Sequence, residues 1–125
     1  MIYSRYLAVA AACFALAGCG LSEEDIRDRR SAAEDIGSAL NARFNRPCVV
    51  EYGETLSSFV FHVSELDWDG MTDGAQNIYV NQCFQESETK SAERGFDTPG
   101  VTIMVNNVIR AIKNRKESTI SKWDE

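Results

Sequence analysis

Four cysteines, Cys13, Cys19, Cys48 and Cys83, are the residues of this 125-residue chain with the clearest capacity for chemistry. A cysteine reacts as its thiolate, which basic neighbours or a Cys-x-x-Cys pair favour by lowering the thiol pKa. No two of the four have that spacing, and no basic cluster surrounds Cys48 or Cys83. The sequence around each cysteine therefore has to indicate its role.

Residues 1–18 have the three-part layout of a secretory signal. Arg5 is their only charged side chain, an apolar run extends from Tyr6 to Ala17, and small residues end the segment. The run is shorter than the about 20 apolar residues that a membrane-spanning helix needs. We predict that residues 1–18 are removed on export.

The residues Leu16-Ala17-Gly18-Cys19 resemble the lipobox of bacterial lipoproteins, in which small residues precede an obligatory cysteine. The resemblance covers this segment only. It implies diacylation of the Cys19 thiol, cleavage before Cys19 and acylation of the new amine, so that several acyl chains hold the protein on a membrane. In this class an aspartate after the cysteine favours the inner membrane. Gly20 occupies that place, which implies the periplasmic face of the outer membrane.

The remaining 107 residues, 19–125, have the size of one membrane-proximal domain. Loss of Arg5 from the 13 basic side chains leaves 12 against 19 acidic ones, a formal charge of −7. This charge argues against nucleic-acid binding. Cys48 and Cys83 would meet an oxidising compartment, so we predict a disulfide between them that stabilises the domain by about 3 to 4 kcal/mol.

The acidic segment Asp67-Trp68-Asp69-Gly70-Met71-Thr72-Asp73-Gly74 carries the candidate binding residues. Trp68 among the carboxylates of Asp67, Asp69 and Asp73 has the composition of a protein-binding hot spot, with burial of Trp68 as the alternative. Calcium binding by this segment is a second alternative, although its spacing is not that of an EF-hand. The Asp-Gly pairs are also typical of turns, and we predict no metal site.

Catalytic residues are not indicated. His62 is the only histidine, and no nucleophile elbow, phosphate loop, zinc-protease motif or dinucleotide fingerprint is present. Asp67 and Asp69 lie too close in one loop for the opposed carboxylates of a glycosidase. We expect a binding protein without a cofactor, and a small hydrolase is the weaker reading.

The predicted elements are one helix, three strands and a second helix. Ser22 and the acidic residues after it predict a helix over 22–45, with an apolar stripe through Ala33, Ile36, Leu40 and Phe44. Runs rich in β-branched and aromatic residues predict antiparallel strands over 48–52, 59–66 and 77–85. Helical spacing from Val101 to Ile112 predicts the last helix, and the alternative is a fourth strand over 101–105 with a shorter helix after Asn107. The fold class is α+β.

These observations predict a lipid-anchored binding module of the bacterial envelope. Its partners are membrane lipid, through acylated Cys19, and an envelope or periplasmic protein. The first reading is an accessory or structural subunit of a secretion, conjugation or outer-membrane assembly. The alternative is an inhibitor or immunity lipoprotein whose acidic loop enters a cationic cleft of a periplasmic toxin or cell-wall enzyme.

Overall fold

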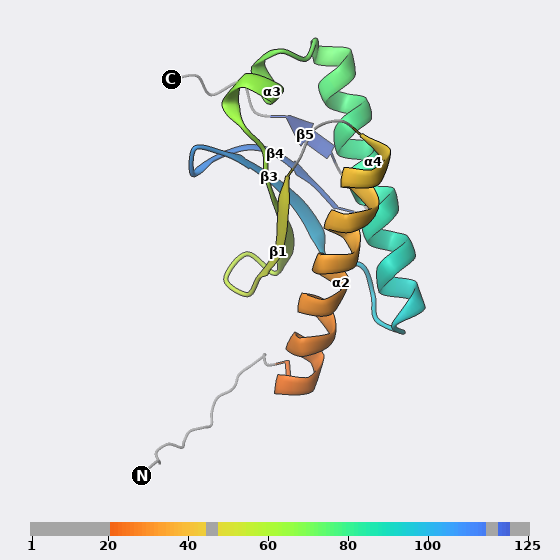
Figure 1. The fold of residues 1–125 in the computed structure, drawn as a ribbon. Coiled ribbons are helices and arrows are strands. Elements are labelled where there is room, and N and C mark those ends of the chain that lie inside the picture. Colours follow the sequence, from red (N-terminus) through yellow and green to blue (C-terminus); the bar gives the residue numbers. More distant parts are fainter. Residues whose placement is uncertain (1–20, 45–47, 115–117, 121–125) are drawn as a thin grey trace.

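The computed structural model describes residues 21–44, 48–114 and 118–120, so residues 1–18 and Cys19 lie outside the described part. The described elements are α2 (Glu23–Arg43), β1 (Val49–Gly53), β2 (Ser58–His62), α3 (Glu65–Asp69), α4 (Asp73–Glu93), β3 (Gly100–Val105), β4 (Val108–Lys113) and β5 (Ser118–Ile120). Figure 1 shows them as one α+β unit, which confirms the predicted class.

The strands form one five-stranded mixed sheet in the order β1-β2-β3-β4-β5. The pairs β1–β2, β3–β4 and β4–β5 are antiparallel, whereas β2 and β3 are parallel. The crossover between β2 and β3 contains α3 and α4, as a parallel pair requires a long connection. The predicted three-stranded antiparallel sheet is therefore wrong in strand number and in the direction of one pair.

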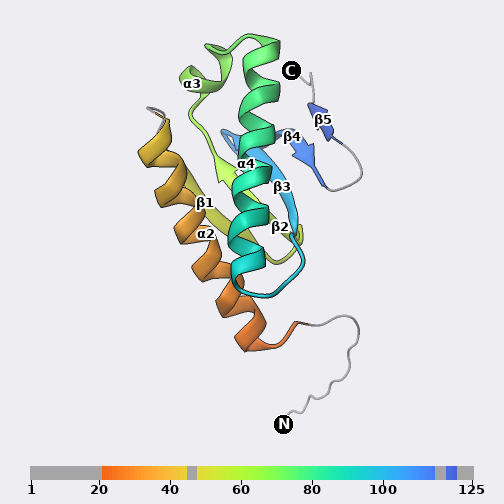
Figure 2. The ribbon, with the colours of Figure 1, turned by 90° about the vertical axis from the view of Figure 1, so that its right-hand side faces the viewer.

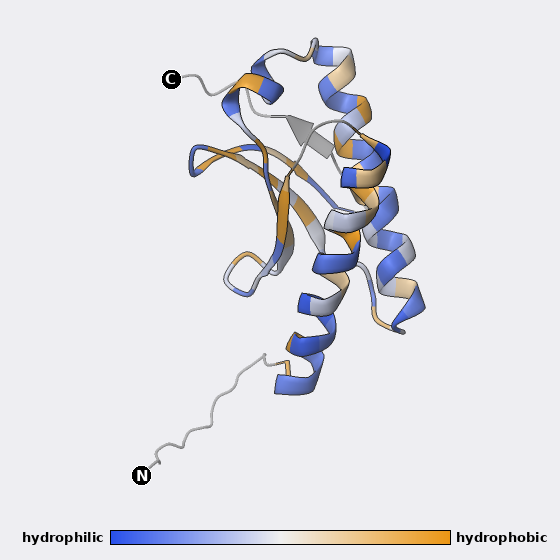
Figure 3. Ribbon diagram, in the orientation of Figure 1, coloured by the Kyte–Doolittle hydropathy of each residue, from blue (hydrophilic) through white to orange (hydrophobic). Residues whose placement is uncertain are grey.

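The helices α2 and α4 lie side by side over one face of the sheet (Figure 2). Aromatic and aliphatic side chains of β2 and β3 fill the space beneath them, with Phe59, Phe61, Val101 and Ile103 fully buried. In Figure 3 hydrophobic residues, in orange, recur along the strands, and many residues of α2 and α4 are hydrophilic, in blue. The core thus lies between one helical layer and one sheet layer.

The helix predicted over 22–45 is confirmed as α2. The Ser22 hydroxyl accepts a hydrogen bond from the Asp25 backbone N–H at 3.1 Å, and the Asp25 carboxylate accepts from the Ser22 N–H. This reciprocal capping box fixes the first turn. The expected stripe of Ala33, Ile36 and Leu40 is buried against the core.

The strand predicted over 77–85 is wrong, because these residues belong to the 21-residue helix α4. Thr72 caps this helix by accepting from the Ala75 N–H at 3.1 Å. The buried positions recur at helical spacing, but several are polar, including Gln76, Ser87 and Ser91. The hydrophobic residues alone therefore did not reveal the helical spacing of the buried positions. The alternation of residue types over 77–85 suggested a strand instead.

The helix predicted over 101–112 is also wrong, and the alternative strand over 101–105 is confirmed as β3. Asn106 and Asn107 have φ of 54° and 64°, and Val105 pairs with Val108 across them. Two residues with positive φ between paired strands form the tight hairpin turn that suits twisted strands. β4 follows in place of the predicted helix.

Candidate functional site

The acidic segment singled out in the sequence lies at one end of the domain, with α3 and the start of α4. Asp67, Trp68 and Asp69 belong to α3, and Asp73 is the first residue of α4. Figure 1 places this end opposite the start of α2. We call it the α3 end: α3, the last turn of α2 and the first half of α4.

Helix capping explains much of the local sequence at the α3 end. The Ser64 hydroxyl accepts from the Asp67 N–H at 3.1 Å, just as Thr72 caps α4. Carboxylates in the first turns of these helices face the positive end of the helix dipole. The segment therefore contains the end of α3, its C-cap Gly70 and the start of α4, and it is not the loop that its glycines suggested.

Trp68 is a core residue, so its predicted role as an exposed docking residue is wrong. Its side chain is 0% exposed, and its carbonyl oxygen accepts from the Gln76 side-chain amide at 3.0 Å. The exposed apolar residue of α3 is Leu66, at 84%. The short helix turns Trp68 inward, and Leu66, two residues earlier, lies at the surface.

Acidic side chains surround Leu66. Glu65 accepts from the Asn106 amide at 2.9 Å, and Asp69 lies 3.9 Å from the Arg110 guanidinium. Glu65, Leu66, Asp69 and Gly70 also line a shallow open hollow. An exposed leucine among carboxylates is a surface that suits a partner with apolar and basic groups.

The charge distribution along the chain supports this reading and was a signal that motif analysis missed. From residue 47 to residue 89 the sequence contains eight carboxylates and no lysine or arginine. This stretch includes all of α3 and the first half of α4. The α3 end is thus rich in carboxylates, and Arg110 of β4 lies beside one of them, Asp69.

Calcium binding by residues 67–73 finds no support in this geometry. Within the described part of the chain no group of three or more His, Cys, Asp or Glu side chains is placed to hold a metal ion. Asp67 and Asp69 lie on α3 and Asp73 begins α4, so these carboxylates do not form the converging set of oxygen ligands that calcium takes.

Cys48 and Cys83 are free thiols in the structure, which corrects the predicted disulfide. Cys83 lies on a helix rather than on a strand beside Cys48, so the cross-strand geometry assumed for the pair does not exist. Tyr79, one turn before Cys83, donates its hydroxyl to the Cys48 sulfur at 3.5 Å.

Burial lowers the reactivity of these thiols. Desolvation raises the pKa of the Cys83 thiol well above its ordinary value, and the neighbouring Cys48 raises it further. Desolvation also raises the pKa of Cys48, and the hydrogen bond from Tyr79 opposes that shift. The thiolate, which is the nucleophilic form, is therefore disfavoured at both positions.

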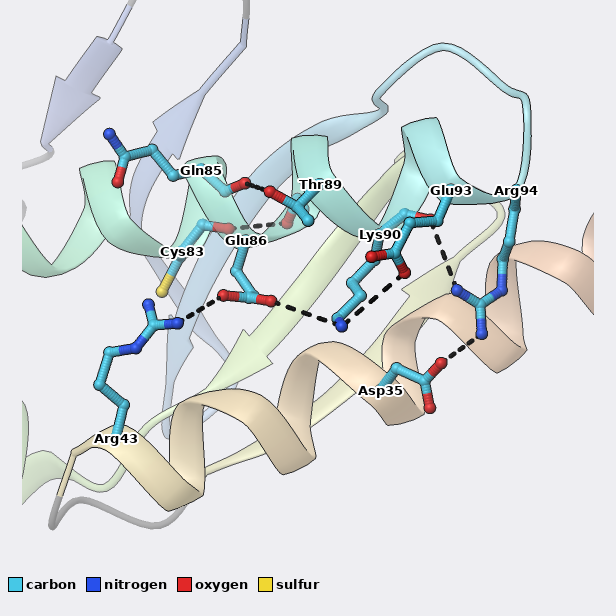
Figure 4. A network of polar contacts seen from close by, with 10 residues as sticks. Asp35, Arg43, Cys83, Gln85, Glu86, Thr89, Lys90, Glu93 and Arg94 are labelled. Atoms are coloured by element: carbon cyan, nitrogen blue, oxygen red, sulfur yellow. Dashed lines mark hydrogen bonds and ion pairs between the residues drawn. The ribbon is translucent and has the colours of Figure 1, made fainter.

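A polar network joins α2 to α4 along their outer side (Figure 4). Glu86, almost fully buried, lies 3.0 Å from the Arg43 guanidinium and 3.8 Å from the Lys90 ammonium. Further along, Arg94 pairs with Asp35. Each carboxylate has a cationic partner from the same or the opposite helix, so the network fixes how the helices pack.

His62 lies on β2 and pairs with Glu51 on β1 at 2.6 Å. The pair is solvent-accessible, and His62 lies three residues before the start of α3. The contact is an exposed hydrogen bond between neighbouring strands.

Comparison of the chain with protein-family models, with curated proteins and with solved structures finds no match. Among the described residues, no helix has the length and apolar character needed to cross a bilayer. The candidate site is therefore identified from the geometry of the α3 end alone.

Proposed function

We propose that this protein is a lipid-anchored binding module of the bacterial envelope that holds a basic protein partner at its α3 end. The observation that carries the proposal is Leu66, which is 84% exposed on a short helix rich in carboxylates. An exposed leucine gives a partner apolar area to bury, and the carboxylates select a partner of opposite charge.

The proposed anchor precedes the start of α2 in the sequence, and the start of α2 is opposite the α3 end. The lipobox-like residues 16–19 end only three residues before Ser22, the cap of α2. With 21 residues at 1.5 Å each, α2 spans about 30 Å. If Cys19 carries acyl chains, α2 acts as a rigid spacer, and the α3 end faces away from the bilayer toward soluble or assembled partners.

Two kinds of partner fit this arrangement. As an accessory subunit, the protein would place the α3 end against a larger envelope assembly such as a secretion, conjugation or outer-membrane apparatus. As an inhibitor or immunity lipoprotein, it would insert the acidic surface into the cationic cleft of a toxin or cell-wall enzyme. Residues 47–89 contain eight carboxylates and no lysine or arginine, and this composition supports the inhibitor or immunity lipoprotein as the second candidate.

The anchor is tested by metabolic labelling with a fatty acid, with fractionation of wild type and Cys19→Ser. We expect label and outer-membrane recovery for the wild type, and loss of both for the variant. Equal recovery of the two proteins in the membrane fraction without label would contradict the lipid anchor.

The docking surface is tested by in-cell photocrosslinking through a benzophenone amino acid at position 66, with position 56 as the matched control. Leu56 is also an exposed leucine, at 42%, but it lies in the turn between β1 and β2, at the end of β2 opposite α3. We expect position 66 to crosslink a protein whose contact segment is basic, and Asp67→Asn combined with Asp69→Asn to weaken that adduct. Identical adducts from both positions would refute a specific α3-end surface. One soluble cationic protein would identify an inhibitor, and several membrane-complex subunits an accessory subunit.

A further inference from the structure

An open hollow lies at the start of α2, where the first turns of the helix meet the turn that joins β1 to β2 (Figure 1). It has a volume of about 360 Å³ and is lined by Glu23, Ile26, Arg27, Arg30 and Glu54. The Arg30 guanidinium lies 2.7 Å from the Glu54 carboxylate and joins the helix to the turn. We call this surface the basal face: residues 21–30 and the turn of residues 54–57.

The basal face exposes one leucine from each of its two segments. Leu21, just before α2, is 43% exposed, and Leu56, in the β1–β2 turn, is 42% exposed. The turn is well defined, because the Ser57 N–H donates to the Glu54 carbonyl oxygen at 3.2 Å. Tight turns are usually made of Gly, Pro, Asn, Asp or Ser, so a leucine in this one adds apolar area at the surface. The two leucines give the basal face an apolar component that burial would stabilise.

The sequence places the proposed lipid next to the basal face. Cys19 precedes Leu21 by two residues, so even a fully extended chain keeps their Cα atoms within about 7 Å of each other. The α3 end, in contrast, is separated from the start of α2 by the length of that helix, about 30 Å. If Cys19 carries acyl chains, the basal face is the part of the domain held at the bilayer.

The charges of the basal face indicate which kind of lipid it suits. Residues 23–30 contain four carboxylates and three guanidiniums, and Glu54 adds one more carboxylate. Arg30 pairs with Glu54, whereas the exposed Arg27 has no hydrogen-bond or ion-pair partner among the described residues. A surface with this excess of carboxylates gains nothing from an anionic membrane. Zwitterionic phospholipid suits both signs, because its phosphate accepts from Arg27 and its ammonium meets the carboxylates.

We propose that the basal face rests on a bilayer of zwitterionic phospholipid, with Leu21 and Leu56 entering the headgroup layer and Arg27 bound to lipid phosphate. This inference rests on the proposed function, because the lipid of Cys19 brings the face to the bilayer. Two leucines alone bind a membrane weakly, but the anchor makes their contact intramolecular and so raises its effective concentration. The contact gives the domain one orientation, with the α3 end directed away from the membrane.

The test uses the full lipidated chain in vesicles of phosphatidylcholine and phosphatidylethanolamine that contain a radiolabelled phospholipid. A benzophenone amino acid at position 56 reports contact with lipid, and position 108 is the matched control. Val108 is 45% exposed but begins β4 at the β3–β4 hairpin. We expect position 56 to crosslink about tenfold more lipid than position 108, as burial of one leucine-sized side chain provides. Adding anionic phosphatidylglycerol should not raise the yield at position 56.

Charge reversal at Arg27 probes the phosphate contact. Arg27→Glu should lower the lipid adduct at position 56 about fivefold, since it replaces a donor to phosphate by a carboxylate. Arg27→Lys keeps the positive charge and should retain most of the adduct. Both variants should melt close to the wild type, because this side chain is exposed and has no partner among the described residues.

Flotation of the vesicles separates failure of the anchor from failure of the basal-face inference. If the wild type floats no better than Cys19→Ser, the lipid anchor fails and the basal-face inference fails with it. If the wild type floats and positions 56 and 108 label equally, the anchor stands and the basal-face inference alone is wrong. A yield at position 56 that rises severalfold with phosphatidylglycerol would overturn the zwitterionic preference, and adducts between two copies in place of lipid would assign the face to a second copy.

Discussion

Separate alanine substitutions of Trp68 and Leu66, two residues of α3, give the most direct test of the structure. Trp68 is fully buried and Leu66 is 84% exposed, although both belong to one five-residue helix. Truncating a fully buried aromatic residue to alanine removes its burial and leaves a cavity, a loss of about 3 to 5 kcal/mol. Truncating an exposed leucine changes the free energy of unfolding by about 0.5 kcal/mol or less.

These free energies convert to a large difference in melting temperature. For a domain of this size each kcal/mol corresponds to roughly 4 °C or more, so Trp68→Ala should lower the melting temperature by about 12 °C or more. Leu66→Ala should melt within about 2 °C of the wild type. Partner binding should respond oppositely: Leu66→Ala weakens it in a fully folded protein.

The assay is thermal unfolding followed by far-ultraviolet circular dichroism, which does not depend on the tryptophan being removed. Trp68→Phe is the matched control, because it keeps an aromatic ring in the core and should melt between the other two. A melting temperature for Trp68→Ala within 3 °C of the wild type would refute the buried placement. It would also restore Trp68 as a candidate docking residue.

The remaining predictions concern the backbone and the thiols. Gly95 has φ of 79° and follows α4 with the two hydrogen bonds of a Schellman motif, so Gly95→Ala should destabilise the protein by about 1 kcal/mol. Gly74 lies in the first turn of α4 with open space around it, so Gly74→Ala should stabilise the protein by up to about 1 kcal/mol. Urea unfolding measures both changes, and the same sign for both would contradict this account. Cys48 and Cys83 should both react with a maleimide only after unfolding, without added reductant; resistance of unfolded protein to labelling would reveal a disulfide. Burial raises both thiol pKa values above the 9.0 of an unfolded chain, so the unfolded state loses its thiol protons at a lower pH than the folded state. The free energy of unfolding should therefore fall as pH rises above about 9. Cys83→Ala should make that fall shallower, and an unchanged pH profile would count against the buried thiol.

Local chemistry explains which predictions from the sequence succeeded. The capping box at Ser22 and the spacing of Ala33, Ile36 and Leu40 are properties of one segment, and both are present in α2 as expected. The two runs of β-branched and aromatic residues that became β1 and β2 are likewise local. In such segments the side-chain pattern and the backbone hydrogen bonds favour the same element.

The second half of the chain shows where local pattern fails. In α4 the fully buried positions include Ser87 and Ser91, and their burial depends on the packing of α4 against the rest of the domain, which the local sequence does not show. In β3 and β4 the valine and isoleucine spacing suits a helix as well as a strand. Only the sheet, where β3 pairs with β2 and β4 pairs with β3, decides between them.

The candidate site divides in the same way. The sequence by itself determined the acidic composition of the α3 end and the lipoprotein-like start of the chain. It did not determine which apolar residue of the segment reaches solvent, because a helix of five residues can be rotated so that Trp68 or Leu66 faces inward. The tertiary structure decided this, since the core offers more apolar area to the larger ring, and Trp68 is buried while Leu66 remains exposed.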